Sequence, residues 1–427
     1  MGNRIFKYMM KLGITIVLVA SPLLRGAVSI WAMMAVAIII MFLVFLWLLK
    51  VNNQTVSNGW LDLEKTPLDI LIFSFVLLAF ISFAFARYKY ASMYALLQML
   101  SYTAFFYLIV NNYGRRIRRY IIRIVIYIGS AISVYGLLQY LGLLPHNWWI
   151  PDKFLSSTYV NHNHFSGYLE LAIPVAIGSL IRYRRVADSS VKIGLMAAIT
   201  VMAMAFIFSQ SRAAWVCLAI SLITMNIILI RRKILGVISV LALIVIFGSI
   251  FSFAYYKKGA VKERIESMSK IMQDEASFQT RVKIWQGTFR MIAKNPVIGT
   301  GIGTFETAFP LYRVDGLNLR ANYTHNDYLQ MASDMGILAP FIMILLLVTI
   351  IKKGVRMGTH PVVLGCTAGI LSLSLHGLVD FNFHIPANMI LFVIYIAIII
   401  GDEKVRELMN VGTSGKPEQT QNDVTNS

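Results

Sequence analysis

Three side chains of this 427-residue chain have the chemistry of a group-transfer site. His325 stands in a Thr-His-Asn run, and an imidazole that titrates near neutrality can accept a proton from an attacking hydroxyl group. Arg212 ends a Ser-Gln-Ser-Arg run at the junction of two apolar runs, where an ionisable side chain is a functional candidate. Arg281 lies one helical turn before Trp285 in a basic loop, and a guanidinium binds phosphate through a planar pair of donors.

Each of these residues also has a purely structural explanation. Thr324 or Asn326 could cap a helix that begins beside His325. Arg212 could extend to a lipid phosphate, and Arg281 could belong to a solvated helix face with an aromatic anchor. The position of His325, directly after a basic loop, favours the functional explanation.

A second group of polar residues lies near the middle of the chain. His162 and His164 follow Asn161 in an Asn-His-Asn-His run, and their spacing could form half a metal site. No carboxylate or cysteine completes that site. We therefore expect no metal and no cofactor, and interpret the run as a source of hydrogen bonds to sugar hydroxyl groups.

A third group lies near the C-terminal end. His376, Asp380 and His384 surround what should be the last outer turn, where they either hydrogen-bond to one another or share a cavity with His325. The Gly299-x-Gly301-x-Gly303 run resembles a nucleotide-binding loop, but the Lys-Ser/Thr pair that should follow is missing. We interpret this run as a turn.

The elements that position these residues are membrane-spanning helices. Hydrophobic residues make up 57% of the chain and charged residues only 14%, whereas a soluble domain has roughly a quarter charged residues. Apolar runs of about 17 to 25 residues recur, which is the length that crosses about 30 Å of hydrocarbon as a helix. Backbone amides in lipid need internal partners, so the sequence predicts an all-α, polytopic helical bundle. We expect about twelve spans, the first starting near Lys11 and the others at about 28–49, 67–85, 91–112, 120–143, 164–181, 193–209, 212–230, 234–255, 327–351, 361–378 and 386–400.

Clusters of basic residues set the expected orientation. The clusters at 115–119, 182–185, 231–233 and 352–356 each follow an even-numbered span, so they share one side of the membrane. By the positive-inside rule that side is the cytoplasm, as are both termini, and the opposite side is the periplasm of a bacterial inner membrane. Much of the formal charge of +19 therefore reflects membrane topology and gives no reason to expect a nucleic-acid partner.

The chain divides into three expected parts. Residues 1–150 form N-terminal transmembrane helices, residues 151–400 form the transmembrane core, and residues 401–427 form a disordered cytoplasmic tail. The core contains a long periplasmic loop at about 256–324, with eleven basic and six acidic residues.

Within this loop, the stretch 278–294 is expected to be helical, and it carries Lys283 and Arg290 as well as Arg281. The basic excess suits an anionic substrate. Attraction to anionic lipid head groups would explain the same charge.

At these residues the chain resembles the O-antigen ligase and polymerase superfamily of bacterial membrane proteins. The similarity covers about 150 to 390, while the first five spans match only in hydropathy. The matching pieces are Asn161 to Leu169, Ser209 to Arg212, Arg281 to Trp285 leading to Asn295 to Gly301, Thr324 to Gln330, and His376 to Pro386.

The resemblance implies an all-helical, GT-C-like membrane glycosyltransferase with a periplasmic loop helix over the site. It further implies a glycan donor on undecaprenyl diphosphate and an acceptor such as lipid A-core, in lipopolysaccharide biosynthesis. In family terms Arg212 and Arg281 hold the diphosphate and His325 acts on the acceptor hydroxyl. We expect substrate contacts from Lys283, Arg290, Asn161, His162, His164, Asn326, His376 and Asp380.

The chemistry of the residues agrees with these roles. Charge develops on a departing diphosphate, so two guanidiniums would stabilise the transition state more than the ground state. We expect a metal-independent, inverting transfer with His325 as base.

Several alternatives share these features. An O-antigen or polysaccharide polymerase and a protein O-oligosaccharyltransferase would use the same chemistry with other acceptors. The compact chain, without a large C-terminal soluble domain, favours a ligase or polymerase. A transporter would need ionisable residues near the bilayer midplane, whereas those of this chain gather at the outer ends of the spans.

Overall fold

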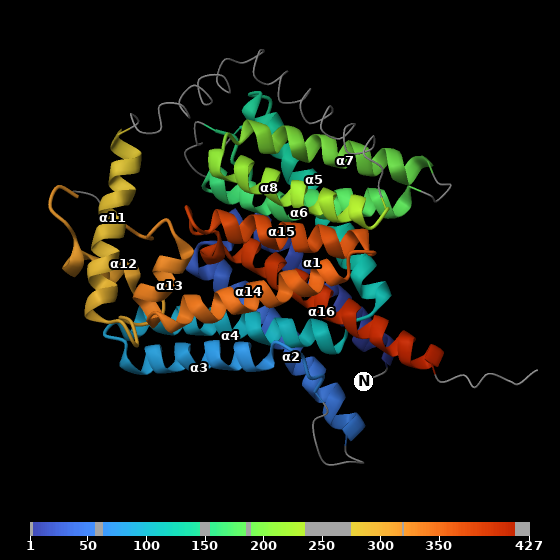
Figure 1. Ribbon diagram of the computed structural model, residues 1–427, viewed down its shortest axis with the longest axis horizontal. Helices are drawn as coiled ribbons and strands as arrows, with labels where there is room; N and C mark the ends of the chain where they lie inside the picture. The colour runs from blue at the N-terminus through green and yellow to red at the C-terminus, as the bar shows by residue number, and fades with distance from the viewer. Residues whose placement is uncertain are drawn as a thin grey trace, which may run out of the picture.

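The computed structural model describes residues 3–55, 63–145, 154–184, 189–234, 275–317 and 320–414. Within these ranges every regular element is a helix, and most of the helices run along the long axis of the molecule (Figure 1). The first half contains α1 (Asn3–Leu23), η1 (Arg25–Ala27), α2 (Ile30–Thr55), α3 (Asp69–Phe85), α4 (Lys89–Asn111), α5 (Arg115–Tyr140), α6 (His162–Tyr183), α7 (Ser189–Phe208) and α8 (Arg212–Arg231). The second half contains α11 (Glu275–Lys294), α12 (Phe305–Ala308), η2 (Phe309–Tyr312), α13 (Asp327–Met335), α14 (Leu338–Arg356), α15 (Pro361–His376), η3 (Asn382–His384) and α16 (Pro386–Ser414).

The helices confirm an all-α, polytopic membrane protein. Nine described helices are long and apolar enough to cross a membrane, and α3 and α15 are shorter apolar helices. Eleven of the twelve expected spans therefore have a helical counterpart. The remaining expected span, at about 234–255, lies almost wholly outside the described residues. The part of the periplasmic loop before residue 275 lies outside them as well.

Two expected boundaries differ from the structure. The expected span 327–351 is divided at Gly336, whose φ of 84° ends α13 before α14 begins. A side chain at Gly336 would meet the carbonyl oxygen of Val297 at 2.1 Å, so the packing of a distant turn determines the break. The tail expected from residue 401 begins as helix, because α16 continues to Ser414, and residues 415–427 lie outside the described part.

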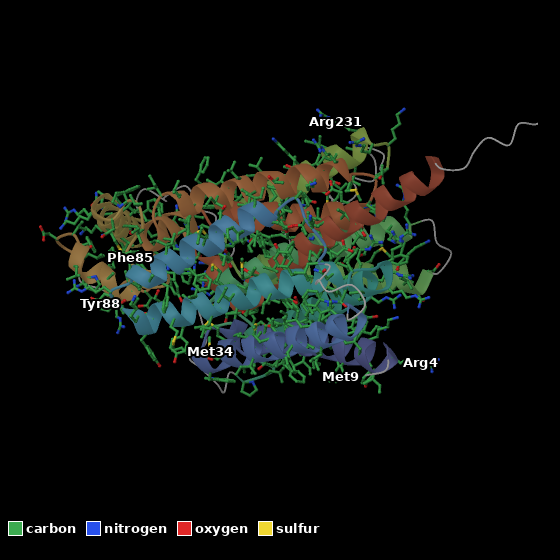
Figure 2. All side chains as sticks on the ribbon, turned by 90° about the horizontal axis from the view of Figure 1, so that it is seen from below. Arg4, Met9, Met34, Phe85, Tyr88 and Arg231 are labelled. Carbon is green, nitrogen blue, oxygen red and sulfur yellow. The ribbon has the colours of Figure 1, made fainter. Side chains whose placement is uncertain are left out.

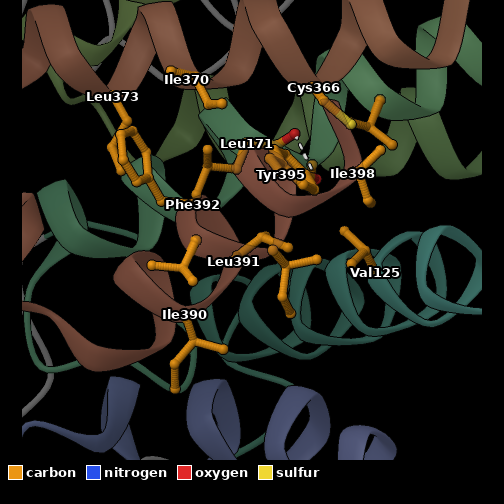
Figure 3. Packing of buried hydrophobic residues seen from close by; sticks show 14 of the residues in the cluster. Val125, Leu171, Cys366, Ile370, Leu373, Ile390, Leu391, Phe392, Tyr395 and Ile398 are labelled. Atoms are coloured by element: carbon orange, nitrogen blue, oxygen red, sulfur yellow. Dashed lines mark hydrogen bonds between the residues drawn. The ribbon is translucent and has the colours of Figure 1, made fainter. Parts of the chain in front are cut away.

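The core of the bundle is the contact between α6, α15 and α16. α6 and α15 pack closely along their length, because Gly178 and Gly365 leave no room for a side chain against the facing backbone. Tyr395 of α16 is fully buried and donates a hydrogen bond to the carbonyl oxygen of Leu171 at 3.1 Å (Figure 3). This tightly packed centre fixes the ends of the three helices relative to one another.

A small second core lies outside the bundle. Its buried residues come from α11, α12, η2 and the chain that follows them, and they are Ile284, Met291, Phe305, Ala308, Phe309, Val314, Leu317 and Ala321. The helix expected at 278–294 is confirmed as α11, which lies at one end of the molecule together with α12 and α13 (Figure 1). This core holds α11 as a rigid element beside the ends of the spans.

The two ends of the molecule differ in composition. Phe85 and Tyr88, between α3 and α4, lie at the end that carries α11, whereas Arg4 and Arg231 lie toward the other (Figure 2). At the α11 end the expected glycine turn is confirmed, since Gly299, Gly301 and Gly303 have φ of 73°, 121° and 71°. The end that carries Arg4 and Arg231 is the arginine-rich end of the molecule, and the end that carries α11 is its loop-covered end.

Candidate functional site

His325 lies in a strained turn at the loop-covered end. Its φ is 53°, a left-handed conformation that costs a non-glycine residue of order 1 kcal/mol or more. The turn is held on both sides, because the Thr324 amide donates to Gln330 Oε1 at 3.0 Å and Asn326 Oδ1 accepts from the Tyr328 amide at 3.0 Å. The imidazole keeps 32% of its surface exposed. The turn therefore presents the His325 side chain to solvent while its backbone is fixed.

Asp380 lies directly beneath His325. Its Oδ1 is 3.5 Å from His325 Nδ1, and its side chain is only 3% exposed. Burial would raise the pKa of Asp380, but the contact with His325 and the charges of His164 and His376 outweigh burial and hold its pKa below the usual range. Asp380 is therefore a buried carboxylate that stays ionised, and it faces the partly exposed imidazole of His325.

Below Asp380 the polar contacts continue into the bundle. His376 Nε2 is 4.0 Å from Asp380 Oδ2, and His376 Nδ1 is 2.9 Å from Glu170 Oε2. His376 and Glu170 are fully buried. Both lie in the closely packed α6–α15 pair, so this chain of contacts links the exposed imidazole to the centre of the bundle.

A second histidine–carboxylate pair lies on the α16 side. His384 Nδ1 is 2.8 Å from Asp327 Oδ1, and the Phe383 amide donates to Asp327 Oδ2 at 3.1 Å. Burial raises the pKa of Asp327, while the bonds from His384 and Phe383 oppose that rise. The Asp327 amide also donates to the Gly377 carbonyl at 2.7 Å. Asp327 thus joins the start of α13 to the turn between α15 and α16.

Aromatic rings close the site between these pairs. Phe381 stacks on Tyr323 with ring centroids 4.1 Å apart, and it meets His164 and His325 edge-on at 4.7 Å and 5.0 Å. His164 is buried, whereas His162 is half-buried against Phe154 at 4.6 Å. The sequence Asn-His-Asn-His therefore contributes one histidine to the site lining and one to its neighbourhood.

The loop helix α11 is attached to both turns of the site. Arg281 Nη1 donates to the Val379 carbonyl at 3.2 Å, and Trp285 Nε1 donates to the Thr324 carbonyl at 2.9 Å. The two residues share a helix face, as the sequence spacing predicts. Lys283 and Arg290 are two and nine residues from Arg281, so they project from a different face of α11. Lys283 donates to the Gly316 carbonyl at 3.0 Å, and Arg290 is exposed.

Arg212 lies at the same end of the bundle. It is the first residue of α8, after a tight turn in which Gln210 has a φ of 57°. The Ser209 hydroxyl lies 2.8 Å from that of Ser166 in the first turns of α6, and His164 of α6 packs on Phe381. The start of α8 is therefore beside the helix that carries the histidine run, and all three principal candidates share one end of the molecule.

Other predicted site residues have structural partners. Asn161 caps α6, since its side chain accepts from the Asn163 amide at 2.8 Å. Asn326 caps α13 and also donates through Nδ2 to the Leu378 carbonyl at 2.8 Å. In the Thr-His-Asn run, Asn326 therefore caps the helix, as the structural explanation expects, while the His325 side chain remains partly exposed.

Sequence reasoning missed Glu170 and Asp327. Glu170 is the one acidic residue inside the apolar run of α6, which is a signal that an intramembrane carboxylate marks a function or a buried pair. Asp327 follows the Thr-His-Asn run directly, at the start of an apolar stretch, and a carboxylate in that position is the signal that could have marked it. Their histidine partners lie about 200 and 57 positions away along the chain.

Two small apolar cavities adjoin the site. Their volumes are about 130 and about 100 Å³, and the first reaches His384. They lie between α3, α4, α14 and α16 and share five lining residues, Phe75, Met99, Tyr102, Met343 and Met389. The two cavities therefore adjoin each other, and one of them begins at His384.

Comparison with known proteins bears on the meaning of this arrangement. Residues 197–344 match a family model described as O-antigen ligase. The matched segment contains Arg212, Arg281 and His325, whereas the remaining contacts of the site come from α6 and the α15–α16 turn. A comparison with curated proteins finds no match. This match and the helical architecture support a multi-pass membrane protein with a glycan-transferring function of the O-antigen ligase or polymerase type.

Proposed function

We propose that the protein is an O-antigen ligase, an inverting glycosyltransferase that moves a glycan from undecaprenyl diphosphate to a sugar hydroxyl of lipid A-core. It acts without a metal in the bacterial inner membrane. The arginine-rich end faces the cytoplasm with both termini, and the site faces the periplasm. The observation that supports the proposal is the partly exposed His325, backed by a buried carboxylate, at the same end as Arg212 and Arg281.

His325 serves as the general base. With its Nδ1–H directed at Asp380, the neutral imidazole has a free Nε2 that accepts the proton of the acceptor hydroxyl. The acceptor oxygen then forms the new bond to the anomeric carbon from the face opposite the diphosphate. The bond between that carbon and the diphosphate breaks, and the leaving group takes the electron pair. The anomeric configuration is therefore inverted.

Arg212 and Arg281 bind the diphosphate. Negative charge grows on the leaving group as the bond breaks, so fixed guanidiniums lower the barrier of the chemical step. Arg281 uses one of its five N–H donors on the Val379 carbonyl, and this bond orients the group while leaving other donors for phosphate oxygens. The two adjoining apolar cavities between α3, α4, α14 and α16, one of which begins at His384, suit part of the hydrocarbon tail of the donor.

The test is a transfer assay with purified protein. The protein is incubated with an undecaprenyl-diphosphate-linked glycan and, separately, with lipid A-core, a second lipid-linked glycan or a serine-containing protein, in EDTA and without nucleotide. We expect transfer to lipid A-core. Extension of the second glycan or of the protein would instead identify a polymerase or an oligosaccharyltransferase, and the absence of any transfer would contradict the proposal.

Substitutions test the residue roles in the same assay. We expect His325→Ala to abolish transfer, whereas His360→Ala, at the opposite end of α15, retains it. Arg281→Lys should also lose most activity, because an ammonium cannot reproduce the planar pair of donors. Arg313→Lys, an exposed loop residue, is its matched control. Full activity of either site variant would remove the role given to that residue.

A further inference from the structure

A large cavity lies away from the candidate site. It is a groove between α5, α6 and α7 with a volume of about 600 Å³, well within the range of about 300 to 1,000 Å³ that is typical of ligand sites. Its lining residues come from 118–134 of α5, 179–183 of α6 and 190–201 of α7, with Val362 of α15. Since α6 begins at the candidate site, this groove lies toward the other, arginine-rich end.

One face of α5 changes character along the groove. Arg119, Arg123, Tyr127, Ser130 and Val134 all line it, and their spacing of three or four residues places them on one stripe of the helix. The stripe passes from guanidinium through a phenol to small and apolar side chains. Arg123 lies eight residues after the start of α5, or about 12 Å along the helix axis. This order matches the head group, interface and tail of a lipid.

The arginines of the groove differ from their buried neighbour. Arg118 is neutralised inside the bundle by an ion pair with Asp402. For Arg119, Arg123 and Arg182, by contrast, no carboxylate among the described residues lies within salt-bridge distance, and all three side chains are exposed. Arg182 enters from the end of α6, so two helices direct guanidiniums at one mouth.

The apolar part of the groove is open because α7 carries small residues there. Gly194, Ala197 and Ala198 line the groove wall, and an ideal side chain at Gly194 would meet no atom within 4 Å. The opposite wall contains Ile126 and Val134. This part lies within segments apolar enough to span a membrane, so its natural occupant is hydrocarbon.

We propose that this groove binds an anionic phospholipid, with head-group phosphate at Arg119, Arg123 and Arg182 and an acyl chain along the wall formed by α5 and α7. Charge complementarity selects the occupant. Three guanidiniums favour a head group with two phosphates, such as diphosphatidylglycerol, over a zwitterionic one. An unpaired arginine this far along a span is costly in hydrocarbon unless a phosphate accompanies it. The site is separate from glycan transfer and does not depend on it.

The experiment titrates the purified full chain with diphosphatidylglycerol in detergent micelles and counts bound lipid by native mass spectrometry. We expect a single tight site and much weaker binding of phosphatidylcholine. Since each arginine near a lipid surface contributes about a fivefold factor, replacing Arg119, Arg123 and Arg182 by glutamine should weaken binding about a hundredfold. Equal binding of the two lipids would overturn the proposal.

A matched variant separates this site from general surface charge. Arg116, Arg231 and Arg356 are exposed arginines outside the groove, and replacing them by glutamine removes the same charge. We expect that control to retain the affinity within about twofold, since the distributed surface charge is screened by salt. Equal losses in the two triple variants would contradict a defined site.

A second variant tests the tail without changing charge. Ala198→Phe fills the groove beside Gly194, and it should weaken diphosphatidylglycerol binding about tenfold, which corresponds to the displacement of about two buried methylenes. Unchanged affinity in this variant would limit recognition to the head group and overturn the acyl-chain part of the proposal. This measurement also stands if the triple arginine variant does not fold.

Discussion

At the scale of single residues, the site places a strained, exposed histidine over a buried charge. The left-handed backbone of His325 is maintained because Thr324 and Asn326 are both hydrogen-bonded within α13. The Asp380 carboxylate is itself oriented, since the Phe381 amide donates to its Oδ1 at 2.9 Å. His325 Nδ1 lies 3.5 Å from this oxygen, so the imidazole faces a fixed negative charge before any substrate binds.

Replacing Asp380 tests whether this orientation matters. We expect Asp380→Asn to lower kcat between about a hundredfold and ten-thousandfold, because the wrong imidazole tautomer is no longer disfavoured. The rate of transfer is the measurement, and an unchanged rate would show that Asp380 has only a structural role. Asp315→Asn, in the exposed loop, should leave the rate unchanged.

At the scale of elements, the turn at 299–303 attaches the loop to the bundle. The Thr300 and Gly301 amides each donate at 3.0 Å to backbone carbonyls of α13, and Gly303 N donates to the buried Asp334. Burial raises the pKa of Asp334 to about 7, so this carboxyl holds a proton through much of the acidic range. The turn and α13 therefore act as one unit that carries His325 at its start.

Gly299 is the residue on which this attachment depends. A side chain there would meet the Asp334 carbonyl at 2.3 Å in addition to the strain of a φ of 73°. We expect Gly299→Ala to lower the free energy of unfolding by about 3 kcal/mol and to reduce transfer, as read from thermal unfolding in detergent and the transfer assay.

Gly142→Ala is the matched control for this substitution. Gly142 has a nearly identical φ of 77°, but an added side chain would meet no atom within 4 Å. The Gly142→Ala variant should therefore lose only about 1 kcal/mol of the free energy of unfolding, which is the cost of the left-handed backbone for alanine. If both variants were equally stable, the close approach of the turn to α13 would not contribute to stability.

At the scale of the whole molecule, one buried ion pair closes the arginine-rich end. Arg118 of α5 pairs with Asp402 of α16, and Tyr113 donates to the same carboxylate at 2.6 Å. Tyr113 lies in the connection between α4 and α5, next to Arg118, whereas Asp402 is 284 positions beyond Arg118 along the chain. The pair therefore holds the N-terminal half against the last helix, opposite the end that carries the site.

Separating this pair should be more harmful than deleting it. Arg118→Met or Asp402→Leu alone leaves an uncompensated buried charge, and we expect each to cost about 3 to 5 kcal/mol of stability. The double substitution should recover most of that loss, since two apolar side chains can fill the space. Chemical denaturation of the three variants measures the coupling, and strictly additive losses would indicate that the two residues do not interact.

Several features of the fold could be predicted because they follow from local physics. Long apolar runs must be helices in lipid, and this rule predicted the eleven spans that have a described helix. The arginine clusters predicted on which side of the membrane each of these helices begins and ends. The period of α11 placed Arg281 and Trp285 on one face. The break at Gly336 could not be predicted, because the apolar pattern continues through it and only the approach of Val297 explains it.

The sequence by itself determined the helical class, the spans and the residues able to bind phosphate or accept a proton, since these depend on side-chain chemistry and local periodicity. Only the tertiary structure decided which of them meet. It brought Asp380 and Glu170 into one chain of contacts with His325 and His376, and it paired Asp327 with His384. The physical reason is that such pairs join helices far apart in the chain, and helix packing sets their register.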